Sequence, residues 1–299
     1  MKENSLPPVL ALVRPYQWTK NLLCLGGVLF SGNAHDPSML LIGLAAVAVM
    51  TLASASVYCF NDIRDREFDR NHPFKRRRPV ASGAVGVQTA ALLGVVLAVG
   101  SLVAACPLGV STLACIAIYL GMGLLYSVWL KHVPLFDVIT LSMGFVLRLL
   151  VGIYATGQIV TSWIVLCTFF LAMLLACGKR RSEVSSAQQN EEVQRPVLAS
   201  YSVEFLDLLV ISAATITLIF YSLFTTASGK NPSLAVTVPF VYYGVMHYSH
   251  LLVVQKSQDE PARILLKDRP MQLCILFWLV TYLVILYTKW QLFDPIVPA

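Results

Sequence analysis

Three aspartates are spaced so that they could share a metal ion. Asp62, Asp65 and Asp69 lie three and four residues apart, directly after an apolar run. On an α-helix this spacing places the three carboxylates on one face, with Asn61 at its edge. Such stacked charges repel one another unless a cation lies between them, and Mg²⁺ binds carboxylates together with substrate phosphates. The pattern therefore predicts a Mg²⁺–diphosphate site at a membrane surface, with the three aspartates as catalytic metal ligands.

A basic run follows the aspartates within the same predicted loop, 61–86. Lys75, Arg76 and Arg78 are candidate substrate-binding residues, as is Asn61 before them, because cations suit phosphate oxygens and a guanidinium binds them in bidentate geometry. A basic run can also be a topology signal that touches anionic lipid headgroups. The combination of carboxylates and cations in one loop is more specific than either part.

Membrane helices are the elements that must position these residues. Of the 299 residues, 57% are hydrophobic and 13% are charged, and the mean hydropathy is +0.70. A soluble chain of this length would have too few charges to cover its surface. A transmembrane β-barrel would show short alternating strands rather than long apolar runs. The composition excludes a typical cytosolic enzyme and predicts an all-α polytopic membrane protein.

Nine apolar runs reach the length of about 20 residues that a bilayer requires. They cover residues 18–34, 38–60, 87–106, 108–129, 137–155, 160–178, 204–226, 235–254 and 272–290. Gly26 and Gly27 interrupt the first run, which membrane helices tolerate. The two largest charged loops follow the second and sixth runs. This period of four runs predicts nine transmembrane helices, arranged as two four-helix halves plus one.

The basic residues indicate how these helices are oriented. With a cytoplasmic N-terminus, nineteen of the 22 Lys and Arg lie on the cytoplasmic side and two on the other. This bias predicts that the N-terminus is cytoplasmic and the C-terminus is not. The carboxylates gather on the same side, which indicates a polar site open to the cytoplasm. We treat 1–299 as a single transmembrane domain with cytoplasmic motif loops at 61–86, 179–203 and 255–271.

The pattern Asn61-Asp62-x-x-Asp65-x-x-x-Asp69 resembles the first Asp-rich motif of the UbiA-type prenyltransferase superfamily. Four segments resemble its decaprenyl-phosphate phosphoribosyltransferase branch: RPYQWTKN at 14–21, DRNHPFKRRRPVASG at 69–83, DVITLSMGFVLRLLVG at 137–152 and GKRRSE at 178–183. The resemblance covers nearly the whole chain. It implies a Mg²⁺-dependent membrane enzyme that transfers 5-phosphoribose from phosphoribosyl pyrophosphate to a polyprenyl phosphate and releases pyrophosphate.

The loop 179–203 lacks the DxxxD motif that aromatic-prenylating members of the superfamily carry there. It contains Lys179, Arg180 and Glu183 instead. More cations and fewer carboxylates suit a donor that brings a 5-phosphate as well as a diphosphate. The difference therefore favours phosphoribosyl transfer over prenylation of an aromatic ring. Glu183 is either a ligand or an i,i+4 partner of Lys179.

Two further cations complete the candidate substrate-binding set. Arg148 lies midway along the fifth run, where a charged residue faces a cavity or a partner by default. It either binds a substrate phosphate or pairs with an acid from another helix. Lys20 enters the first run at the cytoplasmic face, where it is either a snorkelling anchor or a phosphate ligand.

Two other functions were weighed against phosphoribosyl transfer. A prenyltransferase that joins a polyprenyl diphosphate to an aromatic acceptor would lack its usual DxxxD. A transporter of a phosphorylated solute would need a site reachable from both sides of the membrane. The expected partners are phosphoribosyl pyrophosphate, a polyprenyl phosphate and the lipid bilayer of the inner or plasma membrane. A homo-oligomer is left open, and no nucleic acid is expected.

Overall fold

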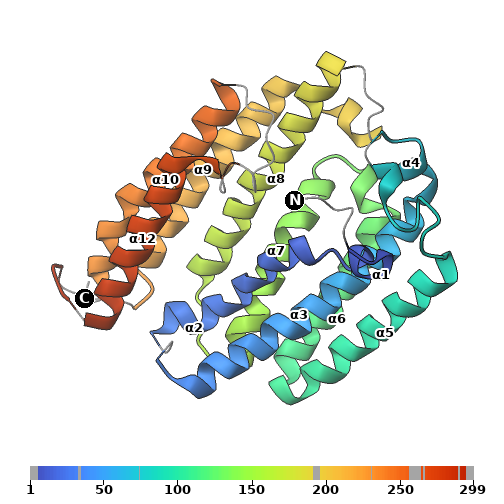
Figure 1. Cartoon of the computed structure of the whole chain (residues 1–299). Helices are drawn as coiled ribbons and strands as arrows, with labels where there is room; N and C mark the ends of the chain where they lie inside the picture. The colour runs from blue at the N-terminus through green and yellow to red at the C-terminus, as the bar shows by residue number, and fades with distance from the viewer. Residues whose placement is uncertain are drawn as a thin grey trace. The chain divides into compact units, whose positions relative to one another are not determined.

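The structure, a computed structural model, describes residues 6–32, 35–73, 75–190, 196–229, 231–255, 264, 267–288 and 290–293. Within these ranges the chain forms α-helices and short 3₁₀ helices (η) and no β-strand (Figure 1). The helices are α1 (Pro8–Leu12), η2 (Pro15–Leu25), α2 (Gly26–Ser31), α3 (Pro37–Arg64), α4 (Arg66–Arg70), η3 (Lys75–Arg77), α5 (Val87–Ala105), η4 (Cys106–Leu108), α6 (Val110–Val128), η5 (Leu130–His132), α7 (Phe136–Ala155), α8 (Ser162–Asn190), η6 (Pro196–Ser200), α9 (Val203–Thr226), η7 (Pro232–Thr237), α10 (Val238–Val253) and α12 (Arg269–Thr288). The predicted all-α class is confirmed.

Seven helices in the described ranges are long and apolar enough to cross a membrane: α3, α5 with η4, α6, α7, α8 to Ala187, α9 and α12. They coincide with seven of the nine predicted runs and indicate a multi-pass membrane protein. The runs 18–34 and 235–254 form shorter, broken helices instead. In the second of these, Pro239 lies in the first turn of α10 and has no N–H to continue a helix from η7, so α10 has only 16 residues.

The chain divides into two compact units. The first comprises Met1–Thr140 with Gly144–Ile159, and the second comprises Leu141–Met143 with Val160–Ala299. The first unit therefore holds four of the predicted apolar runs and most of the fifth, whereas the period of the loops had suggested four. Most of the fifth run, α7, is grouped there because several of its side chains lie in the core of that unit.

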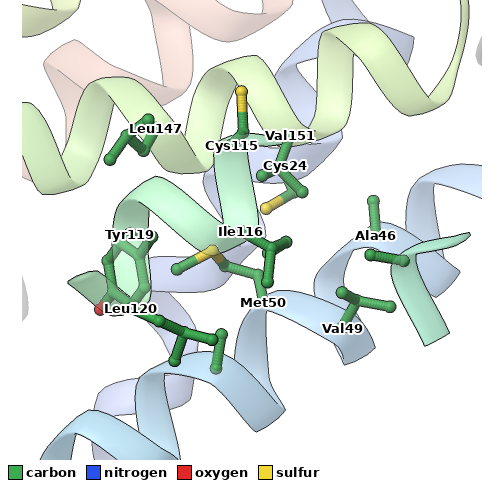
Figure 2. Packing of buried hydrophobic residues seen from close by; sticks show 12 residues of the cluster. Cys24, Ala46, Val49, Met50, Cys115, Ile116, Tyr119, Leu120, Leu147 and Val151 are labelled. Carbon is green, nitrogen blue, oxygen red and sulfur yellow. The ribbon is translucent and has the colours of Figure 1, made fainter. Parts of the chain in front are cut away.

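The core of the first unit shows why α7 belongs to it. Leu147 and Val151, one turn apart on α7, are buried in one cluster with Cys24 of η2, Met50 of α3 and Ile116 of α6 (Figure 2). Residues four apart lie on the same face of a helix, so this face of α7 closes the cluster. The packing fixes η2, α3, α6 and α7, which also carry the polar residues described below.

Glycines allow η2 and α2 to approach the backbone of α7. A Cβ atom on Gly152 would collide with the carbonyl group of Cys24, and one on Gly27 would lie 2.9 Å from the carbonyl oxygen of Gly152. The glycines that interrupt the first apolar run therefore have a packing role. They bring the run close to α7 instead of only weakening its helix.

We expect Gly152→Ala to destabilise the first unit. The new methyl group would meet backbone atoms that cannot rotate away, and such overpacking costs about 1–3 kcal/mol or more. The apparent Tm of purified protein in detergent should fall clearly. Gly100→Ala on α5 is the matched control, because no atom lies within 4 Å of a Cβ added there. Equal melting temperatures for the two variants would contradict the close contact.

The second unit is built around α9. Helix α8 packs along α9, and α10 packs against α9 and α12. Polar contacts join these elements: Tyr221 of α9 lies 2.6 Å from the hydroxyl of Thr237, and Trp278 of α12 donates to the Tyr221 hydroxyl at 2.7 Å. These bonds join α9 to η7 and α12, while the ion pair of Arg181 with Asp207 joins the charged part of α8 to α9.

Candidate active site

The three aspartates lie where α3 gives way to α4. Asp62 is in the last turn of α3, Asp65 is in the turn between the helices, and Asp69 is in α4, beyond the end of α3. The spacing had predicted one continuous helix, and the structure breaks it at Asp65. The i→i+4 pattern nevertheless continues, because Asp65 N–H bonds to Asn61 at 2.9 Å and Asp69 N–H bonds to Asp65 at 2.8 Å.

Asp62 and Asp69 are buried and share a cation. Their exposed fractions are 2% and 1%. Atom Nη1 of Arg78 lies 2.7 Å from Oδ2 of Asp69 and 3.5 Å from Oδ1 of Asp62. Asp62 also forms an ion pair with Arg14. A buried carboxylate without a partner would be strongly unfavourable, so the two arginines offset part of the cost of burying these side chains.

Asp65 has a separate set of partners. Its Oδ1 pairs with the ammonium group of Lys131, a buried residue of η5, and its Oδ2 accepts a bond from the Asn61 side-chain amide at 3.1 Å. The structure thus joins Asn61 to the aspartates, as the sequence predicted. The sequence does not predict the contact between Lys131 and Asp65, because the two residues are 66 positions apart and share no local pattern.

Arg14 was also missed as a site residue, although it opens the quoted segment 14–21. Its backbone adopts φ 50° and ψ 66°, in the left-handed region that is unfavourable for a non-glycine residue. Its guanidinium lies 5.0 Å from the centre of the Tyr58 ring. Burial is the largest single influence on the pKa of Arg14 and acts to lower it. The negative charge of Asp62, the hydrogen bond to Asp62 and the nearby hydroxyls of Tyr16 and Tyr58 together outweigh burial, so the pKa is raised and the guanidinium stays charged.

The basic run after α4 is only partly directed at the aspartates. Arg78 contacts them, as described above. Lys75 lies over the Phe68 ring at 5.6 Å, and Arg76 is exposed on η3. Within the described residues no carboxylate is within ion-pair distance of Arg76. The predicted roles of Lys75 and Arg76 in phosphate binding remain predictions.

Arg148 is 6% exposed and lies in a network of neutral groups within the first unit. Its guanidinium donates to Oδ1 of Asn21 at 2.9 Å, to the carbonyl of Gly144 at 2.7 Å and to the hydroxyl of Tyr119 at 2.8 Å. No Asp or Glu of the described residues pairs with it. The charge of Arg148 is therefore solvated by dipoles rather than neutralised, which is compatible with an anionic ligand.

Lys20 and its neighbour Asn21 have different environments on η2. Lys20 is exposed, whereas Asn21 is buried and also donates to the hydroxyls of Thr51 and Ser54, both at 3.1 Å. Asn21 therefore links α3 to Arg148. The sequence predicts a phosphate-binding role for Lys20 and none for Asn21, because nothing in the sequence shows that the Asn21 amide is buried beside Arg148.

The second unit carries its own charged group on α8. Arg180 is buried and pairs with Glu183, and Arg181 is buried and pairs with Asp207 of α9. The sequence left Glu183 open between a ligand and an i,i+4 partner of Lys179, and the structure shows an i,i+3 ion pair with Arg180. Arg181 was not among the predicted site residues, yet its Nη1 is buried without a hydrogen-bond partner.

Two of the three predicted metal ligands, Asp62 and Asp69, are placed so that they could bind a hard cation together. Among the described residues no group of three or more His, Cys, Asp or Glu side chains converges to hold a metal ion. Asp62 and Asp69 can share one cation, because one Arg78 nitrogen is within reach of both. Mg²⁺ commonly takes one or two carboxylates plus waters and substrate phosphates, so these two residues fit it.

Parts of all three motif loops lie outside the described residues. These are residue 74 of the loop 61–86, residues 191–195 of the loop 179–203, and 256–263 with 265–266 of the loop 255–271. At the end of the last of these loops, Asp268 accepts a bond from the Met271 N–H at 2.8 Å and contacts His247 of α10 at 2.9 Å. This carboxylate therefore caps the start of α12.

The chain is similar to known proteins over most of its length. Residues 21–278 match the UbiA prenyltransferase family. A decaprenyl-phosphate phosphoribosyltransferase of Mycolicibacterium smegmatis is 32% identical over 295 residues, which cover 93% of this chain and 92% of that protein. The enzyme of the same name from Mycobacterium tuberculosis is 31% identical, over 93% of this chain and 94% of its own length.

A solved structure supports the fold independently. The UbiA homologue from Archaeoglobus fulgidus bound to GPP and Mg²⁺ matches with a TM-score of 0.73, covering 94% of this chain and 99% of that one. The sequence identity is 21%, so the likeness shows a shared fold.

Proposed function

Because the chain belongs to the UbiA prenyltransferase family, we propose that it transfers 5-phosphoribose from phosphoribosyl pyrophosphate to a polyprenyl phosphate, with release of pyrophosphate. The relatives named above support this reading, since they are about 30% identical over nearly the whole chain. The observation that carries the proposal is the cluster at the end of α3, where three aspartates form ion pairs with Arg14, Arg78 and Lys131. The carboxylates could bind a metal–diphosphate, and the cations could bind phosphate groups.

The aspartates would act on the leaving group. Asp62 and Asp69 would hold Mg²⁺, and a metal ion bound there would supply positive charge to stabilise the leaving diphosphate. Asn61 would orient Asp65 through its amide, and Lys131 would hold the same carboxylate through their ion pair. The acceptor phosphate is already an anion, so this reaction needs no general base. The apolar helices would accommodate the polyprenyl tail.

The cations of α8 would bind the part of the donor that prenyl diphosphates lack. Lys179 and Arg180 stand where aromatic prenyltransferases of the superfamily carry DxxxD, and a 5-phosphate would be an appropriate ligand for them. The alternatives weighed above, aromatic prenylation and solute transport, gain no observation in their favour. We further propose that 1–299 works as one catalytic domain, because the family match extends through both compact units.

We propose nine membrane crossings with a cytoplasmic N-terminus and an active site facing the cytoplasm. The bias of Lys and Arg to one side supports this orientation. A single cysteine at Ser82, in a variant without other reactive thiols, should react with an impermeant maleimide only after the cytoplasmic face is opened. A tag at Ala299 should be reachable from outside. A cytoplasmic tag would mean that one of the two broken runs does not cross the membrane.

The experiment that tests the proposed function is a pyrophosphate-release assay. Purified protein in detergent or nanodiscs is given phosphoribosyl pyrophosphate, a polyprenyl phosphate and Mg²⁺. Release should require both substrates together. Equal release without the lipid would indicate mere hydrolysis of the donor, and no release with both would contradict the proposal.

A further inference from the structure

The three aspartates of the candidate site are already balanced by cations of the same chain. The pairs are Arg14–Asp62, Lys131–Asp65 and Arg78–Asp69. Arg78 differs from the other two cations, because the single atom Nη1 lies near both Asp62 and Asp69. One positive nitrogen therefore serves two carboxylates that come from different helices.

Asp62 and Asp69 need a positive charge near them in every state of the site. Both are almost completely buried, and two buried carboxylates without a cation would carry a large desolvation cost in addition to their mutual repulsion. Arg14 serves only Asp62 among these two residues. The charge balance between Asp62 and Asp69 therefore depends on whatever lies near both, which in this structure is Arg78.

Arg78 is also the cation that can leave with the least disturbance. It follows η3 in a bend rather than in a helix, and its side chain is 22% exposed, against 13% for Arg14 and 9% for Lys131. A rotation of its side chain would release both carboxylates without moving α3 or α4. The exposed fraction means that the guanidinium already reaches solvent, where it could meet a phosphate ligand.

We propose that Arg78 is an exchangeable counter-ion: it neutralises Asp62 and Asp69 when no metal is bound, and yields them when a divalent cation binds. The freed guanidinium then binds the diphosphate of the donor. This inference rests on the proposed function for the identity of that anion, but the exchange itself concerns only the metal. Arg78 would thus contact the two carboxylates in the metal-free state and the donor phosphate in the metal-bound state.

A permanent clamp is the competing explanation, and metal binding separates the two. If Arg78 competes with the metal, Arg78→Met should bind Mn²⁺ roughly ten- to a hundredfold more tightly than the unchanged protein, since no charge-assisted contact must be broken first. The measurement is a Mn²⁺ titration of the full chain in detergent, followed by electron paramagnetic resonance, without donor. Arg77→Met is the matched control, because Arg77 is an exposed neighbour, and its affinity should be unchanged.

Two further variants show whether the Mn²⁺ signal comes from this site and whether it depends on the charge of residue 78. Asp69→Asn should abolish the bound Mn²⁺, which assigns it to this site. Arg78→Lys keeps a competing charge and should bind Mn²⁺ nearly as weakly as the unchanged protein. Mn²⁺ affinity in Arg78→Met that is equal to or weaker than that of the unchanged protein would overturn the proposal.

A labelling experiment on the unchanged chain covers the case in which Arg78→Met does not fold. Phenylglyoxal modification, read out by mass spectrometry, should increase severalfold at Arg78 when Mg²⁺ is added, while Arg77 in the same molecules should not change. Constant labelling of Arg78 at saturating Mg²⁺ would identify a permanent clamp. Neither measurement contains phosphoribosyl pyrophosphate, so failure of the exchange and failure of the proposed function give distinguishable results.

Discussion

Asp69→Asn is expected to reduce the transfer rate by roughly a hundred- to a thousandfold, the usual cost of removing one preorganised electrostatic group from a transition state. The substitution keeps the shape of the side chain but removes the charge with which Asp69 would hold the metal. Asp62→Asn should have a similar effect for the same reason. The measurement is kcat for pyrophosphate release at saturating donor, acceptor and Mg²⁺.

Glu67→Gln is the matched control for these substitutions. Glu67 is an exposed carboxylate on the same short helix as Asp69, so loss of its charge should leave kcat within about twofold, as is usual for surface changes. EDTA should silence the unchanged protein, and added Mg²⁺ should restore it. Full activity of metal-free protein, or of Asp69→Asn, would contradict the assignment of the aspartates.

Arg180→Ala is expected to raise KM for phosphoribosyl pyrophosphate roughly ten- to a hundredfold, the cost of one or two charge-assisted contacts to a buried phosphate. Lys179→Ala should act in the same direction. Inhibition by ribose 5-phosphate should weaken more than inhibition by pyrophosphate, because the aspartate site would still bind the diphosphate. Initial-rate kinetics with both inhibitors measures this difference.

Glu183→Gln tests whether Arg180 matters only for its ion pair. Glu183 pairs with Arg180 in the structure, so removing its charge should leave the affinity for the 5-phosphate equal or higher. If Arg180→Ala and Glu183→Gln raise KM equally, the pair has a structural role and Arg180 does not bind the donor. A changed Mg²⁺ requirement in Glu183→Gln would instead make Glu183 a metal ligand.

Local spacing predicted the parts of the site that lie close together in the sequence. The Asp-rich pattern identified the family, which the match over residues 21–278 confirms, and Asn61 does contact Asp65. Seven apolar runs became long helices, six of them with nearly the predicted ends. The exception is α8, which continues into the predicted loop as far as Asn190 instead of ending at residue 178. These features depend on periodicity and composition, which a single sequence contains.

The partners of the aspartates depend on tertiary packing and could not be predicted in this way. Arg14 is 48 residues from Asp62, and Lys131 is 66 residues from Asp65. The break of the helix at Asp65 also has no local signal, because the residues around it are neither Gly nor Pro. The packing role of Gly26 and Gly27 could not be predicted either, since only the structure shows α7 lying against them.

The most direct test of the proposed function is to follow which of the two possible donors transfers its labelled group to an acceptor. Purified protein is incubated with Mg²⁺, a polyprenyl phosphate and an aromatic acceptor, and either with phosphoribosyl pyrophosphate labelled in the ribose or with labelled prenyl diphosphate. Our account predicts that label from phosphoribosyl pyrophosphate enters a lipid product that has gained one phosphoribose by mass spectrometry. Prenylated aromatic product from the second donor, with no phosphoribosylated lipid from the first, would contradict it.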